Sequence, residues 1–474
     1  MSVLTSPLWS ALEAAAATGG TLHGGDDWAA SGISIDTRAL APGDLFVALK
    51  DVRDGHDFLG AAAKAGASAA LVSRVPDDAP KTLALLGVTE PLKGLEALGI
   101  VARERHFGKL IAVTGSAGKT STKEMLRTAL GATGSVHAAM KSFNNHIGVP
   151  VSLASLPSTA DFGVFEVGMN HPGEIAPLAA LVRPHASIIT TVAAAHLEAF
   201  DSMEGIAAEK AQIMTGLRPG GAAVLPADNP HYSFLRAEAE RFGVTTIVPF
   251  GQNASATDGV HLTSYTPEEG GATVDGTAFG QSFSFKLNVA GKHHALNAMA
   301  VIGAALNVGA PLDQTLKGLE AFTVGEGRGA TQEVTIGGKR LRIIDESYNA
   351  NPASMAASLA VLANTETGPG GRRVAVLGEM KELGPTAPDL HEGLLTPVCE
   401  AGVNRLFLSG EGMTPLARVL PPTIEWDHER SADLLLSALQ ANLQDGDVVL
   451  FKGSNASGVG GLLAAFLAKA NEAG

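Results

Sequence analysis

A short stretch with two glycines, TGSAGKTS at residues 114–121, combines the residue types that bind phosphate. It follows the apolar run 110–113 and precedes a helical pattern over 120–130, and this order of strand, glycine loop and helix is typical of a phosphate-binding loop. The glycines let backbone N–H groups converge on an anion, and the helix start adds partial positive charge. Lysine and threonine can then reach the outer phosphates and a Mg²⁺ ion. The predicted nucleotide-binding residues here are Gly115, Ser116, Ala117, Gly118, Lys119, Thr120 and Ser121.

The match to the general pattern GxxxxGK[ST] is incomplete, because Val113 stands where the first glycine belongs. What remains is the shorter form GxxGKT. A GKT triplet alone is not rare, so the prediction depends on the strand before the loop and the helix after it.

Two further polar side chains follow apolar strands. Glu166 ends the run FGVFE at 162–166, and His196 comes just after the strand predicted over 187–192. Ligands bind at the carboxyl ends of the strands in parallel sheets, so both side chains are expected at the rim that holds the phosphate loop. Glu166 is a candidate Mg²⁺ ligand together with Thr120, and His196 is a candidate site residue. An ordinary strand-end acid and a structural histidine remain the alternatives.

Lys210 lies among mostly apolar residues in the helical pattern GIAAEKAQIMTGL, 205–217. A lysine in such a place usually extends its amine to solvent. A lysine that faces a metal site can instead react with CO₂. The resulting carbamate is an anion that can hold a second Mg²⁺ and offset clustered positive charge.

The segment GKHHALN at 291–297 opens another helix. Adjacent histidines suggest a metal, but neighbouring positions on a helix point apart. We therefore expect this helix start to offer lysine, histidine and Asn297 to a nucleotide, with a helix cap and solvated histidines as the alternative.

The last third of the chain adds polar groups after strands. GEGRG at 325–329 indicates a hinge, where Arg328 could meet a phosphate when domains close. The loop DESYNANP at 345–352 carries more polar groups than a turn requires, so it is expected to position a substrate or ribose. KGSN at 452–455 follows the last strand and is either a small anion site or a polar turn.

Length and composition limit the class of protein. The 474 residues suffice for about three domains, and 45% of them are hydrophobic. The net charge of −14 argues against nucleic acid as the main partner. The absence of a long apolar run predicts a protein that does not span a membrane, and the N-terminus lacks a basic signal-peptide region. The single Cys399 suits a reducing cytoplasm and is interpreted as a small buried hydrophobe.

The alternation of strands and helices predicts an α/β protein of three domains. Residues 1–107 contain short strands with a Pro-Gly turn. Residues 108–324 predict a doubly wound, largely parallel sheet with a small antiparallel appendage at 250–288 and a closing helix at 292–307. Residues 325–474 predict a Rossmann-like domain.

Motifs in all three segments resemble the Mur ligases, the ATP-dependent amide-forming enzymes of peptidoglycan precursor synthesis. The shared stretches fall in family order: TGSAGKTST, FEVGMNHPGEIA, AHLEAF, IAAEKAQI and GKHHALNA. The loop DESYNANPASM resembles the family members that add D-alanyl-D-alanine, as do SFNNHIGVP, GEMKELG and IDTRALAPGDLFVALKDVRDGHDF. The DNPR loop, usual in members that add the third residue, is not found here.

The resemblance implies an enzyme that uses ATP and Mg²⁺ to join D-alanyl-D-alanine to UDP-N-acetylmuramoyl-tripeptide in the cytoplasm, as a monomer. It implies catalytic or metal roles for Lys119, Thr120, Glu166, His196 and Lys210, the last as a carbamate. It also places Asn297 near adenine, and Arg328 and Asp345 at ATP. The implied UDP-substrate residues are Asp36, Thr37, Arg38 and Asn144, and the implied acceptor-binding residues are Tyr348, Asn349 and Ser454.

Two positions depart from the family pattern. Thr191 stands where relatives often have asparagine, and Asn455 replaces the arginine of a final KGSR loop. The departure at Thr191 could change how groups are positioned near the metal. The departure at Asn455 could remove an anion contact from the final loop. Three other readings stay open at this point: a ligase of the same superfamily with a different acceptor, a phosphate-loop kinase or GTPase, and a non-catalytic nucleotide-binding protein. No NKxD base-reading motif is present, which disfavours a GTPase.

Overall fold

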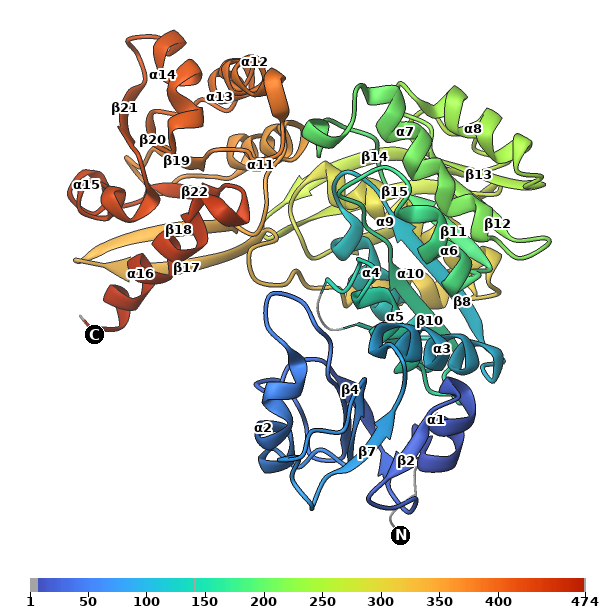
Figure 1. Ribbon diagram of the computed structural model, residues 1–474. Coiled ribbons are helices and arrows are strands. Elements are labelled where there is room, and N and C mark those ends of the chain that lie inside the picture. Colours follow the sequence, from blue (N-terminus) through green and yellow to red (C-terminus); the bar gives the residue numbers. More distant parts are fainter. Residues whose placement is uncertain (1–6, 140–141, 473–474) are drawn as a thin grey trace.

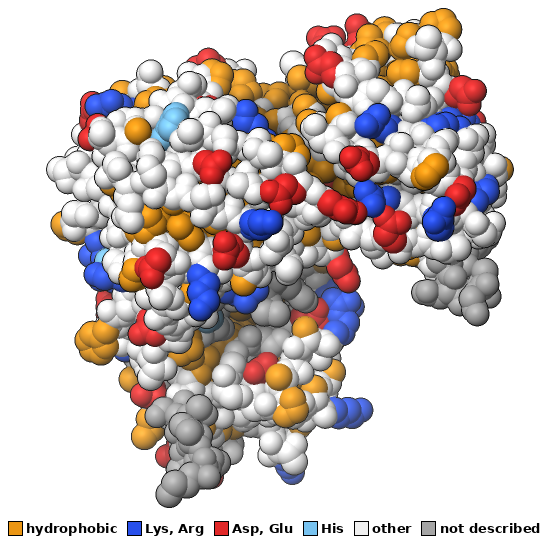
Figure 2. All heavy atoms as spheres, turned by 180° about the vertical axis from the view of Figure 1, so that it is seen from behind, with side chains coloured by type: hydrophobic (Ala, Val, Ile, Leu, Met, Phe, Trp, Pro, Cys, Tyr) orange, Lys and Arg blue, Asp and Glu red, His pale blue; other side chains and the backbone are white. Residues whose placement is uncertain are grey.

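The computed structural model describes residues 7–139 and 142–472, so the first six residues of the N-terminal stretch considered above lie outside it. Figure 1 shows three units in chain order, with the central unit in contact with both others. Among the described residues, no helix combines the length and apolar character needed to cross a membrane. Acidic and basic side chains are interspersed over the described part of the face shown in Figure 2, unlike the basic surfaces that bind nucleic acids.

The N-terminal unit is built on a five-stranded sheet of order β2-β7-β6-β5-β4, parallel except between β2 and β7. Its strand β6 is buried along its whole length, as expected for the apolar run AALV in a parallel sheet. Helix α3 packs on the central unit as well as on this sheet. The elements are β1 (Trp9–Ser10), α1 (Ala11–Thr18), β2 (Thr21–His23), β3 (Ala29–Ala30), β4 (Gly32–Ser34), β5 (Asp44–Val47), α2 (Leu59–Lys64), β6 (Ala69–Val72), β7 (Ala84–Gly87) and α3 (Pro91–Glu104).

The central unit contains a nine-stranded sheet of order β16-β15-β14-β13-β12-β11-β8-β10-β9. Pairing is parallel from β9 to β14 and antiparallel from β14 to β16. The predicted antiparallel appendage is formed by β14 to β16, which continue the parallel sheet at one edge. Its strands are β8 (Lys109–Thr114), β9 (Val136–Ala138), β10 (Phe162–Glu166), β11 (Ala186–Ile189), β12 (Ala222–Pro226), β13 (Thr246–Gly251), β14 (Val260–Glu268), β15 (Gly271–Ala278) and β16 (Gln281–Leu287).

Helices cover both faces of this sheet, which makes it doubly wound. Leu110 and Ala112 of β8 belong to one hydrophobic core, and Ile111 and Val113 belong to the other, as the alternation of side chains along a strand requires. The helical pattern at 205–217 lies in a helix that becomes 3₁₀-helical after residue 211. The helices are α4 (Lys119–Gly131), α5 (Gly148–Ala154), α6 (Ile175–Val182), α7 (Met203–Ala211), α8 (Tyr232–Arg241), α9 (Lys292–Asn307) and α10 (Leu312–Glu320).

The C-terminal unit has a six-stranded sheet of order β17-β18-β22-β19-β20-β21, parallel except between β17 and β18. Its strands are β17 (Ala330–Ile336), β18 (Lys339–Glu346), β19 (Arg373–Gly378), β20 (Arg405–Ser409), β21 (Glu425–Glu429) and β22 (Val448–Lys452). Its helices are α11 (Pro352–Asn364), α12 (Ala387–Glu392), α13 (Leu395–Glu400), α14 (Thr414–Val419), α15 (Leu436–Asn442) and α16 (Val459–Glu472). The start of α11 and the ends of β18 and β22 contribute residues to a cleft shared with the central unit.

Candidate active site

A cleft of about 730 Å³ lies between the central and C-terminal units, a size suited to a small-molecule ligand. Loop residues 116–121 line it from the central side, and residues 348–351 line it from the C-terminal side. The ends of β8, β10 and β11 are adjacent in the sheet, so their polar end residues meet at this rim.

The phosphate loop has the local geometry that its sequence predicts. It connects β8 to α4, and Gly118 adopts a left-handed conformation with φ of 81° just before the helix. A Cβ atom at Gly115 would stand 1.8 Å from Thr190 Oγ1, so only glycine fits there. Ser116 is held in place within the loop, because its hydroxyl donates to the carbonyl of Ala193 over 2.8 Å.

Lys119 lies across this loop and donates from Nζ to the carbonyl oxygen of Gly115 over 2.8 Å. Burial lowers the pKa of Lys119, while nearby Glu166 raises it and Arg328 lowers it further. The cationic side chains of Lys119 and Arg328 are thus held at the loop, and an anion such as a triphosphate would pair with both.

Glu166 and Thr120 form a pair of oxygen donors at the same rim. The Thr120 hydroxyl donates to Glu166 Oε2 over 2.8 Å, and Asn144 Nδ2 donates to Glu166 Oε1 over 2.7 Å. Glu166 is only 3% exposed. A buried carboxylate beside a hydroxyl provides the hard oxygen ligands that Mg²⁺ takes, so the residues present fit this ion.

His196 lies near this pair and contacts a residue that the sequence did not suggest. Its Nδ1 forms an ion pair with Glu382, which belongs to the loop after β19 in the C-terminal unit. Both residues have left-handed backbone conformations, with φ of 59° and 63°. Burial lowers the pKa of His196, Glu382 raises it, and Lys119 and Lys210 lower it again. The stretch GEMKELG carries a family resemblance, and nothing in its residues predicts this contact.

Lys210 is buried, with 1% of its surface exposed, so a solvent-extended amine is excluded. Its Nζ contacts Met169 Sδ at 3.8 Å. Burial lowers the pKa of Lys210 well below its usual value, and the charge of Lys119 adds to this effect. A neutral amine is the form that reacts with CO₂, so the site supports the carbamate hypothesis chemically.

The nucleotide side of the cleft is formed by α9 and the hinge. The Asn297 side chain is buried and lies against Gly118, where a Cβ atom would be 3.0 Å away. Arg328 stacks on Tyr348 with 3.9 Å to the ring centroid and donates to the Ser142 hydroxyl over 3.2 Å. The ring centroids of His293 and His294 lie 4.1 Å apart. The two side chains therefore lie side by side, whereas the sequence predicted that they would point away from each other.

Several predicted residues also have contacts within the protein. Asp345, predicted at ATP, accepts hydrogen bonds from the backbone N–H groups of Gly327 and Ser347 and so shapes the hinge. Asn144, predicted at the UDP-substrate, is bound to Glu166. Thr191, one of the departures, accepts a hydrogen bond from Asn229, which also donates to the next carbonyl and so supports the loop.

The remaining predicted residues divide between the cleft and the N-terminal unit. Tyr348, Asn349, Ser454 and Asn455 line the cleft, and the Ser454 hydroxyl donates to the carbonyl of Glu379. Asp36 and Arg38 form an ion pair at 2.7 Å in which the arginine is largely exposed. Among the described residues, Asp36, Thr37 and Arg38 are not part of the cleft lining. Cys399 is exposed, so its interpretation as a buried hydrophobe is wrong.

The fold and the cleft define a multidomain α/β protein with a phosphate loop, a paired oxygen site and a C-terminal unit that lines the same cleft. The chain belongs to the Mur ligase family. Residues 113–305 match the Mur ligase middle domain, and residues 332–455 match the Mur ligase, glutamate ligase domain.

Curated relatives agree with this assignment. The UDP-N-acetylmuramoyl-tripeptide–D-alanyl-D-alanine ligase of Synechocystis is 34% identical over 94% of this chain and 93% of its own length. The ligase of the same name from Escherichia coli is 36% identical over 82% of this chain and 83% of its own length.

Solved structures show the same arrangement. A crystal structure of MurF from Acinetobacter baumannii has a TM-score of 0.83 and 29% identity, and covers 97% of this chain and 99% of its own. MurF ligase from Thermotoga maritima in complex with ADP has a TM-score of 0.77 and 26% identity, and covers 94% of this chain and 98% of its own.

Proposed function

We propose that the protein joins D-alanyl-D-alanine to UDP-N-acetylmuramoyl-tripeptide by an amide bond at the expense of ATP. The observation that carries the proposal is the shared cleft. It contains a phosphate loop with a half-buried lysine on one side and the DESYNANP loop of the C-terminal unit on the other. The similarity to ligases of this name over nearly the whole chain supports the choice of substrates.

The chemistry requires activation of a carboxylate, because hydroxide is a poor leaving group. An oxygen of the terminal tripeptide carboxylate attacks the γ-phosphorus of ATP. The bond from that phosphorus to the bridging oxygen breaks, and ADP leaves. The amine of D-alanyl-D-alanine then attacks the acyl carbon and loses a proton, and phosphate departs with the electrons of the C–O bond. The first step increases charge on the transferred phosphoryl oxygens, and the Lys119 ammonium and the Arg328 guanidinium, which lie near each other, would offset it.

We further propose that Thr120 and Glu166 hold Mg²⁺ and that Lys210, as a carbamate, and His196 hold a second ion. Bound Mg²⁺ would supply additional positive charge at the phosphates. The protein itself contributes the dry site, since Glu166 and Lys210 are both almost fully buried. Exclusion of water protects an acyl phosphate from hydrolysis.

The N-terminal unit is proposed to bind the UDP-sugar through Asp36, Thr37 and Arg38. The acceptor is proposed to bind to Tyr348, Asn349 and Ser454. Asn297 is proposed to lie near adenine, and Asn144 to reach the UDP-substrate while bound to Glu166. We also propose that the chain has three domains, with bounds 1–107, 108–324 and 325–474. The protein is proposed to be a monomer located in the cytoplasm. The location is supported by the joint need for ATP and a UDP-linked precursor.

The decisive experiment measures phosphate release from ATP with Mg²⁺ and UDP-N-acetylmuramoyl-tripeptide, with D-alanyl-D-alanine, D-glutamate, a diamino acid or no acceptor. Release that depends on D-alanyl-D-alanine, with a pentapeptide product by mass, is the expected result. Release with another acceptor would move the chain to a sister ligase, the main alternative. Lys119→Ala should abolish release, and Lys109→Ala, at an exposed lysine that begins the preceding strand β8, should not.

A further inference from the structure

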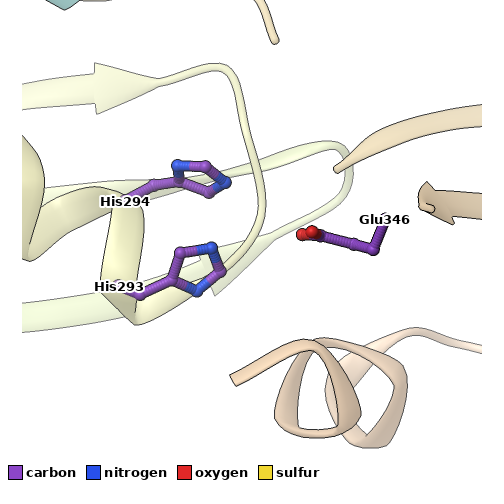
Figure 3. A group of neighbouring side chains, drawn as sticks. All are labelled: His293, His294 and Glu346. Atoms are coloured by element: carbon purple, nitrogen blue, oxygen red, sulfur yellow. The ribbon is translucent and has the colours of Figure 1, made fainter. Parts of the chain in front are cut away.

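A compact group of three ligand-type side chains lies at the junction of the central and C-terminal units. His293 and His294 come from the first turn of α9, and Glu346 is the last residue of β18. One ligand atom of each lies within 4.8 Å of the others. Figure 3 shows the Glu346 carboxylate directed at the two imidazole rings. We call these three residues the histidine–glutamate cluster.

His294 is the unusual member of the cluster. It is 2% exposed, yet neither of its ring nitrogens has a hydrogen-bond partner within residues 7–139 and 142–472. Buried polar atoms in native proteins almost always have a partner, so this side chain requires one. A ligand that accepts a nitrogen lone pair would satisfy it.

The geometry shows where such a ligand would lie. A Cβ atom built on Gly329 would be 3.3 Å from Glu346 Oε1 and 3.4 Å from His294 Nε2, so these two atoms face the same small space. Gly329 has a left-handed φ of 104°, which suits glycine. The missing side chain thus leaves room beside both ligand atoms.

The two oxygens of Glu346 have separate surroundings. While Oε1 faces His294, Oε2 lies 3.6 Å from Nζ of the buried Lys452. Lys452 also donates to the carbonyl of Asn349 over 3.0 Å. A carboxylate whose second oxygen has a cationic partner is held in orientation for a ligand on its first oxygen, as in the outer shell of metal sites.

The chemistry of the cluster differs from that of the proposed Mg²⁺ site. Thr120 and Glu166 present oxygen atoms alone, whereas the cluster presents two imidazoles and one carboxylate. Imidazole suits zinc and related transition metals, and Mg²⁺ prefers oxygen. Burial lowers the pKa of both histidines, and the neutral imidazole that results is the form that binds metals.

We propose that His293, His294 and Glu346 bind a transition-metal ion such as Zn²⁺, which ties helix α9 of the central unit to strand β18 of the C-terminal unit. Three protein ligands leave the fourth coordination position to solvent. The ion would hold the two walls of the cleft together at a point separate from the oxygen-donor pair.

The test uses the full chain, freed of metal and nucleotide, and titrates it with Co²⁺ as a spectroscopic probe before displacement by Zn²⁺. The expected result is one saturable equivalent with the intense visible absorption of four-coordinate Co²⁺, lost when Zn²⁺ is added. His294→Asn and Glu346→Gln should each weaken binding at least about tenfold. His23→Asn, at an exposed histidine of the N-terminal unit, should bind as the parent does.

The two variants lie on different units, so loss in both shows that the ion bridges them. Saturation that survives Glu346→Gln would overturn the bridge, and absence of saturable absorption in the parent would overturn the site. Folding of each variant is checked by its melting temperature without metal. Because absorption is measured without turnover, failure of this site is distinguishable from failure of the proposed ligase activity.

Discussion

The side chain of Asn351 joins two functions, since it caps helix α11 and also donates to the carbonyl oxygen of Ser116 in the phosphate loop. Its Oδ1 accepts from the backbone N–H of Ser354 over 2.8 Å, and its Nδ2 reaches Ser116 over 3.0 Å. Asn351 is 8% exposed, so this bond across the cleft is shielded from water. The C-terminal unit therefore contacts the phosphate loop directly, through the loop that carries the most specific sequence motif.

The first prediction separates these two functions. Asn351→Asp keeps the cap, because aspartate accepts from an N-cap position as well as asparagine does. It removes the donor to Ser116 and places a carboxylate against a carbonyl oxygen. We expect a fall of about tenfold or more in kcat/KM for ATP, measured by phosphate release at a temperature well below the melting temperature of the variant. Asn351→Ser, which also caps but cannot reach the loop, should show the same loss, and parental kinetics in both variants would contradict the role.

The second prediction concerns Glu382, which contacts His196 across the same cleft. If this carboxylate orients the imidazole for a metal, Glu382→Gln should raise the Mg²⁺ concentration needed for half-maximal activity by about tenfold. Its side chain is 55% exposed, so stability should change little. The control is Glu392→Gln, an exposed glutamate of helix α12. An unchanged Mg²⁺ dependence in Glu382→Gln would exclude the orienting role.

The local parts of the site could be predicted from sequence, and the contacts between units could not. The strand before residue 115 and the helix from Lys119 follow from apolar runs and glycine positions, which act over a few residues. The partners of His196 and Ser116 come from a distant part of the chain, and no periodicity encodes how two domains meet. This is why Glu382 was missed.

Two features had local causes. Asp345 lies at the end of a strand and also accepts from turn N–H groups, a contact that its position before a turn allows, and its role at ATP stays a prediction. The histidines were expected to diverge because neighbouring helix positions do. They occupy the first turn of α9, however, where no preceding turn restricts their rotamers, so both rings can face the same side.

The third prediction tests the carbamate on Lys210. Lys210→Ala should lose at least about a hundredfold in kcat, because it removes an anionic group from a site that contains Lys119. Formate supplies a small carboxylate and should restore part of the activity. Lys119→Ala should not respond to formate, which makes it the matched control. Full activity of Lys210→Ala without an additive would refute the role.

The fourth prediction concerns stability and pH through His185, which lies just before β11. Burial lowers the pKa of His185 to about 4, and Arg218 and Lys109 contribute. Its Nδ1 accepts from the backbone N–H of Leu110 over 3.0 Å, which only an unprotonated nitrogen can do. In the unfolded chain a histidine titrates near about 6.5. Between these values the unfolded state binds more protons, so the stabilisation is complete above pH 6.5 and is lost as the pH falls towards 4.

Because this histidine is only half-buried, solvent screening reduces the expected loss to about 1–2 kcal/mol between pH 7 and pH 4.5. His185→Asn keeps an acceptor for Leu110 and does not titrate, so its free energy of unfolding in urea should fall less over that range. His171→Asn, at an exposed histidine, should retain the parental slope. Equal slopes in His185→Asn and the parent would show that the proton uptake of His185 does not contribute to acid sensitivity. Other histidines with lowered pKa values, including His106 and His137, should keep the remaining slope positive in both variants.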